Sequence, residues 1–506
     1  MQSLLVGNGI DIQIEGMDFH NKWIIVRLLA DAKVGKFVDL FKNPKSDTPA
    51  ISADDLVELF LSMPTIGNKV KNGEYDCLID KAEEPEIYEA LISFKSRYVD
   101  EVHSAEEIGL EDWLFLLRVF LQEQPDLLPL YETAKQGFER VVLDAIYCNG
   151  DAQRLHKNIG KNAKEFFCGF DNVFTINYDN ALEKATGKEV FHLHGDFETK
   201  AISENPDTAY GYLRQQTGEA VYFPPQFQHC NCNAILNYSG DSKYRLATAL
   251  SNSLYEFERL KVLFEENRKE AESIISKFPA EQQKIIRLGL EKDLPFGYNY
   301  HFNRLEQLTG ELTIIGIAPQ NDSHLFECIN RSNLDKVVFY HFYPYEGAPD
   351  PILPISKPYE IEDVHELWSS LGLQSPTYIS PTVRDFSFKA LKHKSETQKF
   401  TDVFNTFETK GNSVTIEEIC NQLKSIPKET EKSIIKMMIL EIQKDKYHAS
   451  PKTEKDLFSQ FRSFGRTLVT ASLCPQALYF LYLSNMPQPS RHTSANTTKR
   501  KKKRRN

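Results

Sequence analysis

The sequence predicts an α/β fold: a Rossmann-like parallel sheet with large helical insertions, followed by a helical C-terminal region. Short apolar runs, rich in β-branched and aromatic residues, have the length of strands that are buried on both faces. These runs cover residues 3–6, 172–175, 190–193, 312–315 and 337–340. Because long helical stretches separate them, the strands should pair in parallel.

The stretches between the strands carry apolar residues at the spacing of an amphipathic helix. One stripe is formed by Trp113, Leu114, Leu116, Leu117, Phe120 and Leu121, and another by Leu254, Phe257, Leu260 and Phe264. We place the large helical insertions at about residues 20–165 and 240–300. Residues 1–345 then form one α/β domain.

The pattern changes after this domain. Five prolines crowd residues 344–358, which predicts a linker or extended wrap over residues 346–380. A helical stripe around Ile434 and Met438 predicts a helical region over residues 381–485. The polar residues 486–506 end in a basic run and should be a disordered tail, either solvated without a role or acting as a nucleic-acid arm or nuclear address.

Composition narrows the classes of function. The formal net charge of −11 argues against a chain that coats nucleic acid with its whole surface. The eight cysteines are scattered, which favours a reducing, cytoplasmic compartment over a disulfide framework. Membrane contact is not expected, because no apolar run is long enough for a span and the N-terminus lacks the basic region of a signal peptide.

A glycine turn follows the first predicted strand. Gly7, Asn8 and Gly9 would let backbone amides approach a pyrophosphate, and Asp11 follows closely. Ile12 stands where the dinucleotide fingerprint has its third glycine, so a simple tight turn is the alternative interpretation.

Polar residues follow the second strand. Asn177, Tyr178, Asp179 and Asn180 come after Thr175, at the carboxyl edge of the sheet where ligands bind in open α/β folds. Helix capping would explain one of these residues, but not all of them.

The third and fourth strands also end in candidate site residues. His192 and His194 alternate along a strand, and a histidine before Gly195 can act as an acid or base near neutral pH. The alternatives are a structural histidine or half of a metal site, but no further ligands cluster nearby and we predict no metal. The fourth strand ends at Gly316, followed by Asn321 and Asp322.

Taken in order, these motifs resemble the sirtuin-like superfamily, most closely its bacterial branch in anti-phage defence. The resemblance covers residues 1–345 in islands, and the glycine turn is also similar to AbiH-type abortive-infection proteins. It implies an NAD-binding domain in which Asn177 and His194 line the site where the nicotinamide–ribose bond breaks. By the same resemblance, the NAD contacts would be Gly7, Asn8, Gly9, Thr175, Asp179 and Gly316, with Asp11, Asn321 and Asp322 as ribose contacts.

Departures from the family pattern bear on the activity. Deacetylating sirtuins carry two Cys-x-x-Cys pairs that hold zinc. In this chain the only closely spaced cysteines are Cys230 and Cys232, beside His229. The resemblance therefore implies NAD hydrolysis rather than deacetylation, gated so that the host survives. It also implies a homo-oligomer, or a partner such as a HerA-type ATPase or an Argonaute. The alternatives are a non-catalytic sensor of NAD or ADP-ribose derivatives, a deacetylase, and nucleic-acid binding through the tail.

Overall fold

The computed structural model describes residues 1–373, except for 16–18, 42–50, 80, 83, 103–104, 123–130, 218–222 and 344–347. The predicted helical region 381–485 and the basic tail 486–506 lie outside the described residues.

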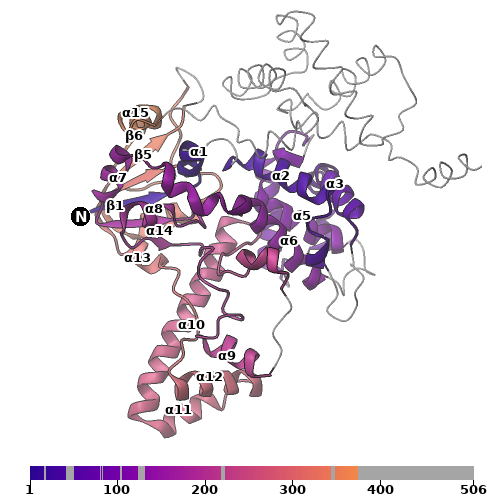
Figure 1. The fold of residues 1–506 in the computed structure, drawn as a ribbon, viewed down its shortest axis with the longest axis vertical. Coiled ribbons are helices and arrows are strands. Elements are labelled where there is room, and N and C mark those ends of the chain that lie inside the picture. The colour runs from indigo at the N-terminus through magenta and orange to yellow at the C-terminus, as the bar shows by residue number, and fades with distance from the viewer. Residues whose placement is uncertain are drawn as a thin grey trace, which may run out of the picture. The chain divides into compact units, whose positions relative to one another are not determined.

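A six-stranded parallel sheet forms the centre of the described domain (Figure 1). Its strands are β1 (Gln2–Val6), β2 (Asn172–Thr175), β3 (Phe191–His192), β4 (Thr309–Ile315), β5 (Asn333–His341) and β6 (Tyr359–Asp363). Their spatial order is β3-β2-β1-β4-β5-β6, and every pair is parallel. The predicted α/β class is therefore confirmed. The order reverses between β1 and β4, which is the switch point where doubly wound folds bind ligands.

Helices cover both faces of the sheet, so its strands are buried on both sides. On one face Leu5 packs with Phe174 and Ile314 against α13 (Phe302–Glu306) and α14 (Ser323–Arg331). On the other face Leu4 and Val6 pack against α1, α7, α8 and α15. These helices span Gly9–Glu15, Lys161–Cys168, Ala181–Thr186 and Val364–Ser370. Burial on both faces explains why three consecutive residues of β1, Leu4–Val6, are apolar.

The first insertion, between β1 and β2, is helical as predicted. Its main helices are α2 (Asn21–Lys33), α3 (Ala53–Lys71), α4 (Pro85–Arg97), α5 (Leu110–Gln122) and α6 (Tyr131–Tyr147), followed by α7. The ring of Phe60 on α3 lies 5.2 Å from Trp113 and 5.5 Å from Phe138. The aromatic residues of α3, α5 and α6 thus form a core of their own.

The second insertion, between β3 and β4, begins earlier than the sequence predicts. It contains α9 (Ala209–Thr217), α10 (Gly240–Glu266), α11 (Arg268–Ile275) and α12 (Ala280–Lys292). A capping box between Ser239 and Ser242 begins α10. The start of this long helix lies by α13 and α14, and its far end lies by α11 (Figure 1).

The proline-rich segment requires a correction. The sequence predicts a linker or wrap over residues 346–380, but β6 and α15 lie within it and complete the sheet and one of its helical layers. β6 is an edge strand with the sequence YEIED, and its charged, largely exposed side chains hide it from a search for apolar runs.

Two further properties of the described residues agree with the composition. None of the described helices has an apolar stretch long enough to cross a membrane. The six cysteines in this part of the chain are all free thiols.

The turns that follow β1 and β4 meet backbone to backbone at the switch point. The Gly7 amide donates to the Ile315 carbonyl at 3.0 Å, and the Gly9 amide donates to the Gly316 carbonyl at 3.1 Å. A Cβ atom at Gly9 would lie 2.5 Å from the Gly316 Cα, and Gly316 itself has φ of +72°. Both turns need glycine at this contact, because a Cβ atom on either one would overlap the backbone of the other.

We therefore expect Gly9→Ala to lower the free energy of unfolding by about 1–3 kcal/mol, because the added methyl group overlaps Gly316. Urea unfolding followed by circular dichroism measures this change. Gly160→Ala is the matched control, since no heavy atom lies within 4 Å of its added Cβ. Equal losses in both variants would contradict the close contact.

Candidate functional site

The loops at the carboxyl edge of the sheet carry most of the residues that the sequence selects. The first residue of the loop after β2 is bonded to the end of β1, because the Ile176 amide donates to the Val6 carbonyl at 3.1 Å. The loop after β4 is held to the same place by the glycine contact. The carboxyl ends of β2, β1 and β4 therefore form one continuous edge.

A buried acidic pair and an amide occupy this edge. The Asn177 Nδ2 atom donates to the Asp11 Oδ1 atom at 3.1 Å, and the side chains of Asp11 and Asp179 are hydrogen-bonded to each other. Burial, and then the negative charge of Asp179, raises the pKa of Asp11 well above its usual value. Burial also raises the pKa of Asp179, whereas its hydrogen bond with Asp11 lowers that pKa, so Asp11 is the carboxyl group of the pair that holds a proton more readily.

Several predicted contact residues shape these loops. The Thr175 Oγ1 atom accepts from the Asn177 amide at 3.0 Å, and Asp179 Oδ1 accepts from the Ala181 amide at 2.8 Å, where α8 begins. The Asn8 Nδ2 atom donates to the Phe19 carbonyl at 2.7 Å. The N-cap residue of α8 is Asn180, whose side chain makes no capping hydrogen bond, so the capping alternative does not hold for Asp179, whose carboxylate also bonds Asp11.

The glycine amides have partners within the protein. Gly7 and Gly9 each donate to the backbone at the end of β4, as described above, so these two amides fix the loops to each other. The sequence expects them to face a pyrophosphate. The structure explains both glycines by the contact with Gly316 instead.

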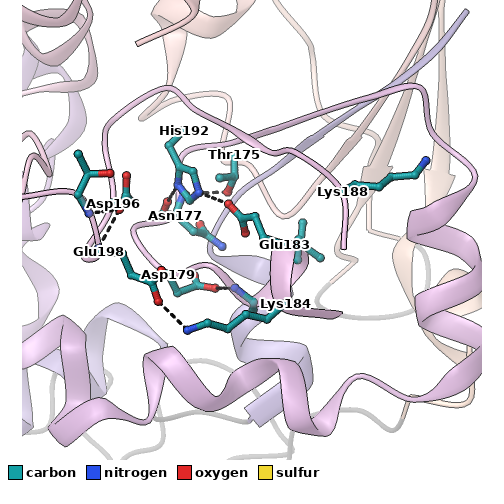
Figure 2. Close-up of polar contacts among 12 residues, drawn as sticks. Thr175, Asn177, Asp179, Glu183, Lys184, Lys188, His192, Asp196 and Glu198 are labelled. Atoms are coloured by element: carbon teal, nitrogen blue, oxygen red, sulfur yellow. Dashed lines mark hydrogen bonds and ion pairs between the residues drawn. The ribbon is translucent and has the colours of Figure 1, made fainter. Parts of the chain in front are cut away.

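His192 secures the loop that carries Asn177 (Figure 2). Its Nδ1 atom lies 3.0 Å from the Asn177 carbonyl oxygen, and its Nε2 atom bonds the Glu183 carboxylate on α8. Burial alone would lower the pKa of His192, but the hydrogen bond and charge of Glu183 raise it to about 9. His192 is therefore a charged positioning residue that bonds both the loop carrying Asn177 and α8.

His194 lies in a different environment from His192. β3 ends at His192, so the strand alternation that the sequence suggests does not extend to His194. The His194 ring is 3% exposed, and its Nε2 atom lies 3.2 Å from the Nε2 atom of His324 on α14. Burial, and then the positive charge of Lys243, lowers the pKa of His194 well below its usual value. Burial also lowers the pKa of His324, to about 3, so both rings are neutral near pH 7.

The insertions contribute charged residues that sequence reasoning missed. Lys243 on α10 is buried, and its Nζ atom donates to Glu111 Oε1 on α5 at 2.9 Å and to the Tyr178 hydroxyl at 3.3 Å. Burial opposes the charged form of Lys243, but Glu111 outweighs it and raises the pKa. The partners are 132 residues apart. Only the capping box at the start of α10 is a local signal, and it concerns the helix rather than the lysine.

The two residues predicted after Gly316 differ. Asn321 is exposed, whereas the carboxyl group of Asp322 is desolvated close to Glu111 and Lys243. Burial, and then the charge of Glu111, raises the pKa of Asp322 to about 7. Asp322 thus lies in the surroundings of the Glu111–Lys243 pair.

The polar residues of the site, some predicted and some not, therefore fall into two neighbouring groups. Asp11, Asn177 and Asp179 form one, which we call the acidic group; His194, His324 and Lys243 form the other, the imidazole group. Tyr178 joins the two groups, because it follows Asn177 in the chain and its hydroxyl contacts Lys243. Asn177 and His194 themselves are not hydrogen-bonded to each other within the described residues.

A separate cluster has the ligand types of a metal site. The side-chain donor atoms of Asp144, His229 and Cys230 all lie within 4.8 Å of one another. The Lys36 Nζ atom lies 2.6 Å from Asp144 Oδ2 and brings a positive charge to the cluster, which would oppose a bound cation. His192 and His194 do not share such a cluster, because their rings have different partners.

Comparison with protein-family models, with curated proteins and with solved structures found no match for this chain.

The His192–Glu183 pair predicts a specific pH dependence of stability. The pKa of His192 is about 9 in the folded chain, against 6.5 for an ordinary histidine. Its contribution is therefore complete below pH 6.5 and is lost as the pH rises through 9, so we expect the free energy of unfolding to fall by roughly 3 kcal/mol over this interval.

Glu183→Gln should flatten this part of the stability profile, measured by urea unfolding at several pH values. Glu272→Gln is the matched control, because the Glu272 carboxylate forms an ion pair with Arg287 and not with His192. A profile that stays steep in Glu183→Gln would assign the pH dependence to another group.

Proposed function

We propose that this chain binds NAD+ at the carboxyl edge of its sheet and hydrolyses the nicotinamide–ribose bond, releasing nicotinamide and ADP-ribose. The observation that carries the proposal is the acidic group beside the switch point of a sheet with the Rossmann strand order. The motif Thr175-Ile176-Asn177-Tyr178-Asp179, which resembles that of sirtuin-like proteins, supplies Asn177 and Asp179 of this group, and the glycine turn after β1 leads to Asp11.

The bond to be broken explains the use of a buried acidic pair. As the nicotinamide leaves with the bonding electrons, positive charge develops on the ribose, as in glycoside hydrolysis. Asp11 and Asp179 are hydrogen-bonded to each other in a site screened from water, so one of them can hold a proton while the other provides a negative charge. A fixed negative charge in such surroundings stabilises the developing cation more strongly than it would in solvent.

Asn177 and His194 each keep one atom for a ligand. Within the described residues, the Asn177 Oδ1 and His194 Nδ1 atoms have no hydrogen-bond partner, whereas Nδ2 and Nε2 of the same side chains are bonded to Asp11 and His324. We assign Asn177 to orienting the attacking water or a ribose hydroxyl. His194 hydrogen-bonds a ribose hydroxyl and assists removal of the proton as water adds to the ribose carbon.

The depressed pKa of His194 suits this role. An imidazole that is neutral near pH 7 can accept a proton, and a protonated one cannot. Burial, and then the positive charge of Lys243, lowers the pKa of His194 and keeps its ring neutral, while Glu111 forms an ion pair with Lys243.

The insertions connect the site with the remainder of the described domain. Glu111 belongs to the first insertion and Lys243 to the second, so a change in either insertion reaches the imidazole group. We propose that NAD depletion serves anti-phage defence and that oligomerisation or a partner protein gates it through these insertions.

The test is nicotinamide release from NAD+ by the purified full-length chain, measured by liquid chromatography. Asn177→Ala and His194→Ala should each lower turnover by about 10²-fold or more, because each removes a group that acts on the reacting sugar or water. Asn303→Ala is the matched control, since Asn303 is exposed and bonds only Tyr255.

Circular dichroism and the melting temperature must show that both variants stay folded. Full turnover in a folded Asn177→Ala, His194→Ala double variant would refute the proposal. Binding of NAD+ without release of nicotinamide, with and without the protein encoded beside it, would favour the sensor instead.

A further inference from the structure

A cavity of about 320 Å³ lies away from the sheet edge, between α6, the start of α10 and the segment 230–236. Leu143, Ile202, Phe223, Leu236 and Leu246 supply apolar walls. Its volume is at the lower end of the range of cavities that hold small organic ligands.

Arg140 gives this cavity a cationic group. Its guanidinium lies 4.5 Å from the centre of the Phe223 ring, and burial lowers its pKa. Among the described residues, no carboxylate forms an ion pair with Arg140. The two glutamates in the wall have other cations as partners: Glu204 pairs with Arg214 at 3.1 Å, and Glu139 lies 3.8 Å from Lys135.

The Arg140 guanidinium is partly buried, and although the charges of Glu139 and Glu204 act on it, it forms no ion pair with either, so an anionic ligand can bind it. The Phe223 ring favours a planar ligand body. Two residues with amide side chains, the exposed Gln136 and the half-buried Asn231, also line the cavity. They offer donors and acceptors to the edge of a ring.

We infer that this cavity binds a small organic anion, a phosphate or carboxylate group carried on a planar ring, and that its occupancy is transmitted to His194. The binding follows from the cavity alone. The effect on catalysis rests on the proposed function.

The segment that carries the signal lies between the cavity and the imidazole group. The Ile235 amide donates to the His194 carbonyl at 2.8 Å, and the Asn233 Oδ1 atom accepts from the Asp196 amide at 2.8 Å. The Tyr178 hydroxyl donates to the Ile235 carbonyl at 2.7 Å. Asn233 and Ile235 also line the cavity, so a ligand there contacts the residues that hold the His194 loop.

Close packing prevents this segment from moving independently of the site. A Cβ atom on Gly195 would lie 2.3 Å from the Asn233 carbonyl oxygen, and Gly195 has φ of +80°. A shift of Asn233 must therefore move the backbone beside His194, because interiors this dense transmit displacement.

Calorimetric titration of the full-length chain with AMP and with indole-3-carboxylate tests the binding. These probes carry a phosphate and a carboxylate on a planar ring, so the one that binds identifies the class of anion. We expect Arg140→Met to weaken its binding at least tenfold. Arg268→Met is the matched control, because Arg268 also lies over a phenylalanine, 4.7 Å from the Phe264 ring, but outside the cavity.

A second variant tests the cavity without removing a charge. Leu246 lines the cavity and is 41% exposed, so Leu246→Trp should fill the space without disturbing the core, and should also weaken binding tenfold or more. No binding of either probe, or binding unchanged in both variants, overturns the inference. AMP binding that is lost in Asn177→Ala but kept in Arg140→Met places AMP at the sheet edge and also overturns it.

Hydrogen exchange measured by mass spectrometry tests transmission independently of catalysis. The probe should slow exchange severalfold in residues 194–199 and 233–236 of the wild-type chain and leave it unchanged in Arg140→Met. If the probe slows exchange but the chain does not cleave NAD+, the proposed function is refuted and this inference is still supported. Unchanged exchange in a chain that binds the probe overturns the transmission.

Discussion

The contact between the turns after β1 and β4 is the constraint on which the site depends. Three glycines bring the two backbones together where the strand order reverses, and backbone hydrogen bonds from Gly7 and Gly9 hold them there. Asp11 follows Gly9 by two residues, so the same contact fixes its position beside the loop after β2. Without this contact, the acidic pair and Asn177 would have no common frame.

Electrostatic surroundings give two nearby histidines opposite states. His192 is held charged by Glu183, whereas His194 is held neutral by burial, Lys243 and His324. The first arrangement suits a residue that fixes a loop, because a charged hydrogen bond is strong and directional. The second suits a proton acceptor. The difference arises from the neighbouring helices. α8 supplies the Glu183 carboxylate to His192, and α10 places the Lys243 ammonium group near His194.

The insertions are part of the site and also of its surroundings. α5 and α10 deliver the Glu111–Lys243 pair to the imidazole group, and α6 supplies Arg140 to the cavity behind the segment 230–236. Residues 233–236 of this segment have no regular secondary structure, so their backbone groups are free to bond with neighbours on both sides. That property makes it suited to connecting an effector cavity with a catalytic loop.

The sequence by itself determined the α/β class, five of the six strands, and the placement of Asn177 and the glycine turns at the sheet edge. These features are local: apolar runs report burial, glycines report close approach, and polar residues after a strand report its carboxyl end. The tertiary structure alone decided that His194 meets His324, that Lys243 meets Glu111, and that β6 extends the sheet. The paired side chains lie 130 and 132 residues apart, and β6 is an edge strand that needs little apolar character. Such pairings depend on which loops the strand order brings together, and that order is a property of the packed sheet rather than of any local pattern.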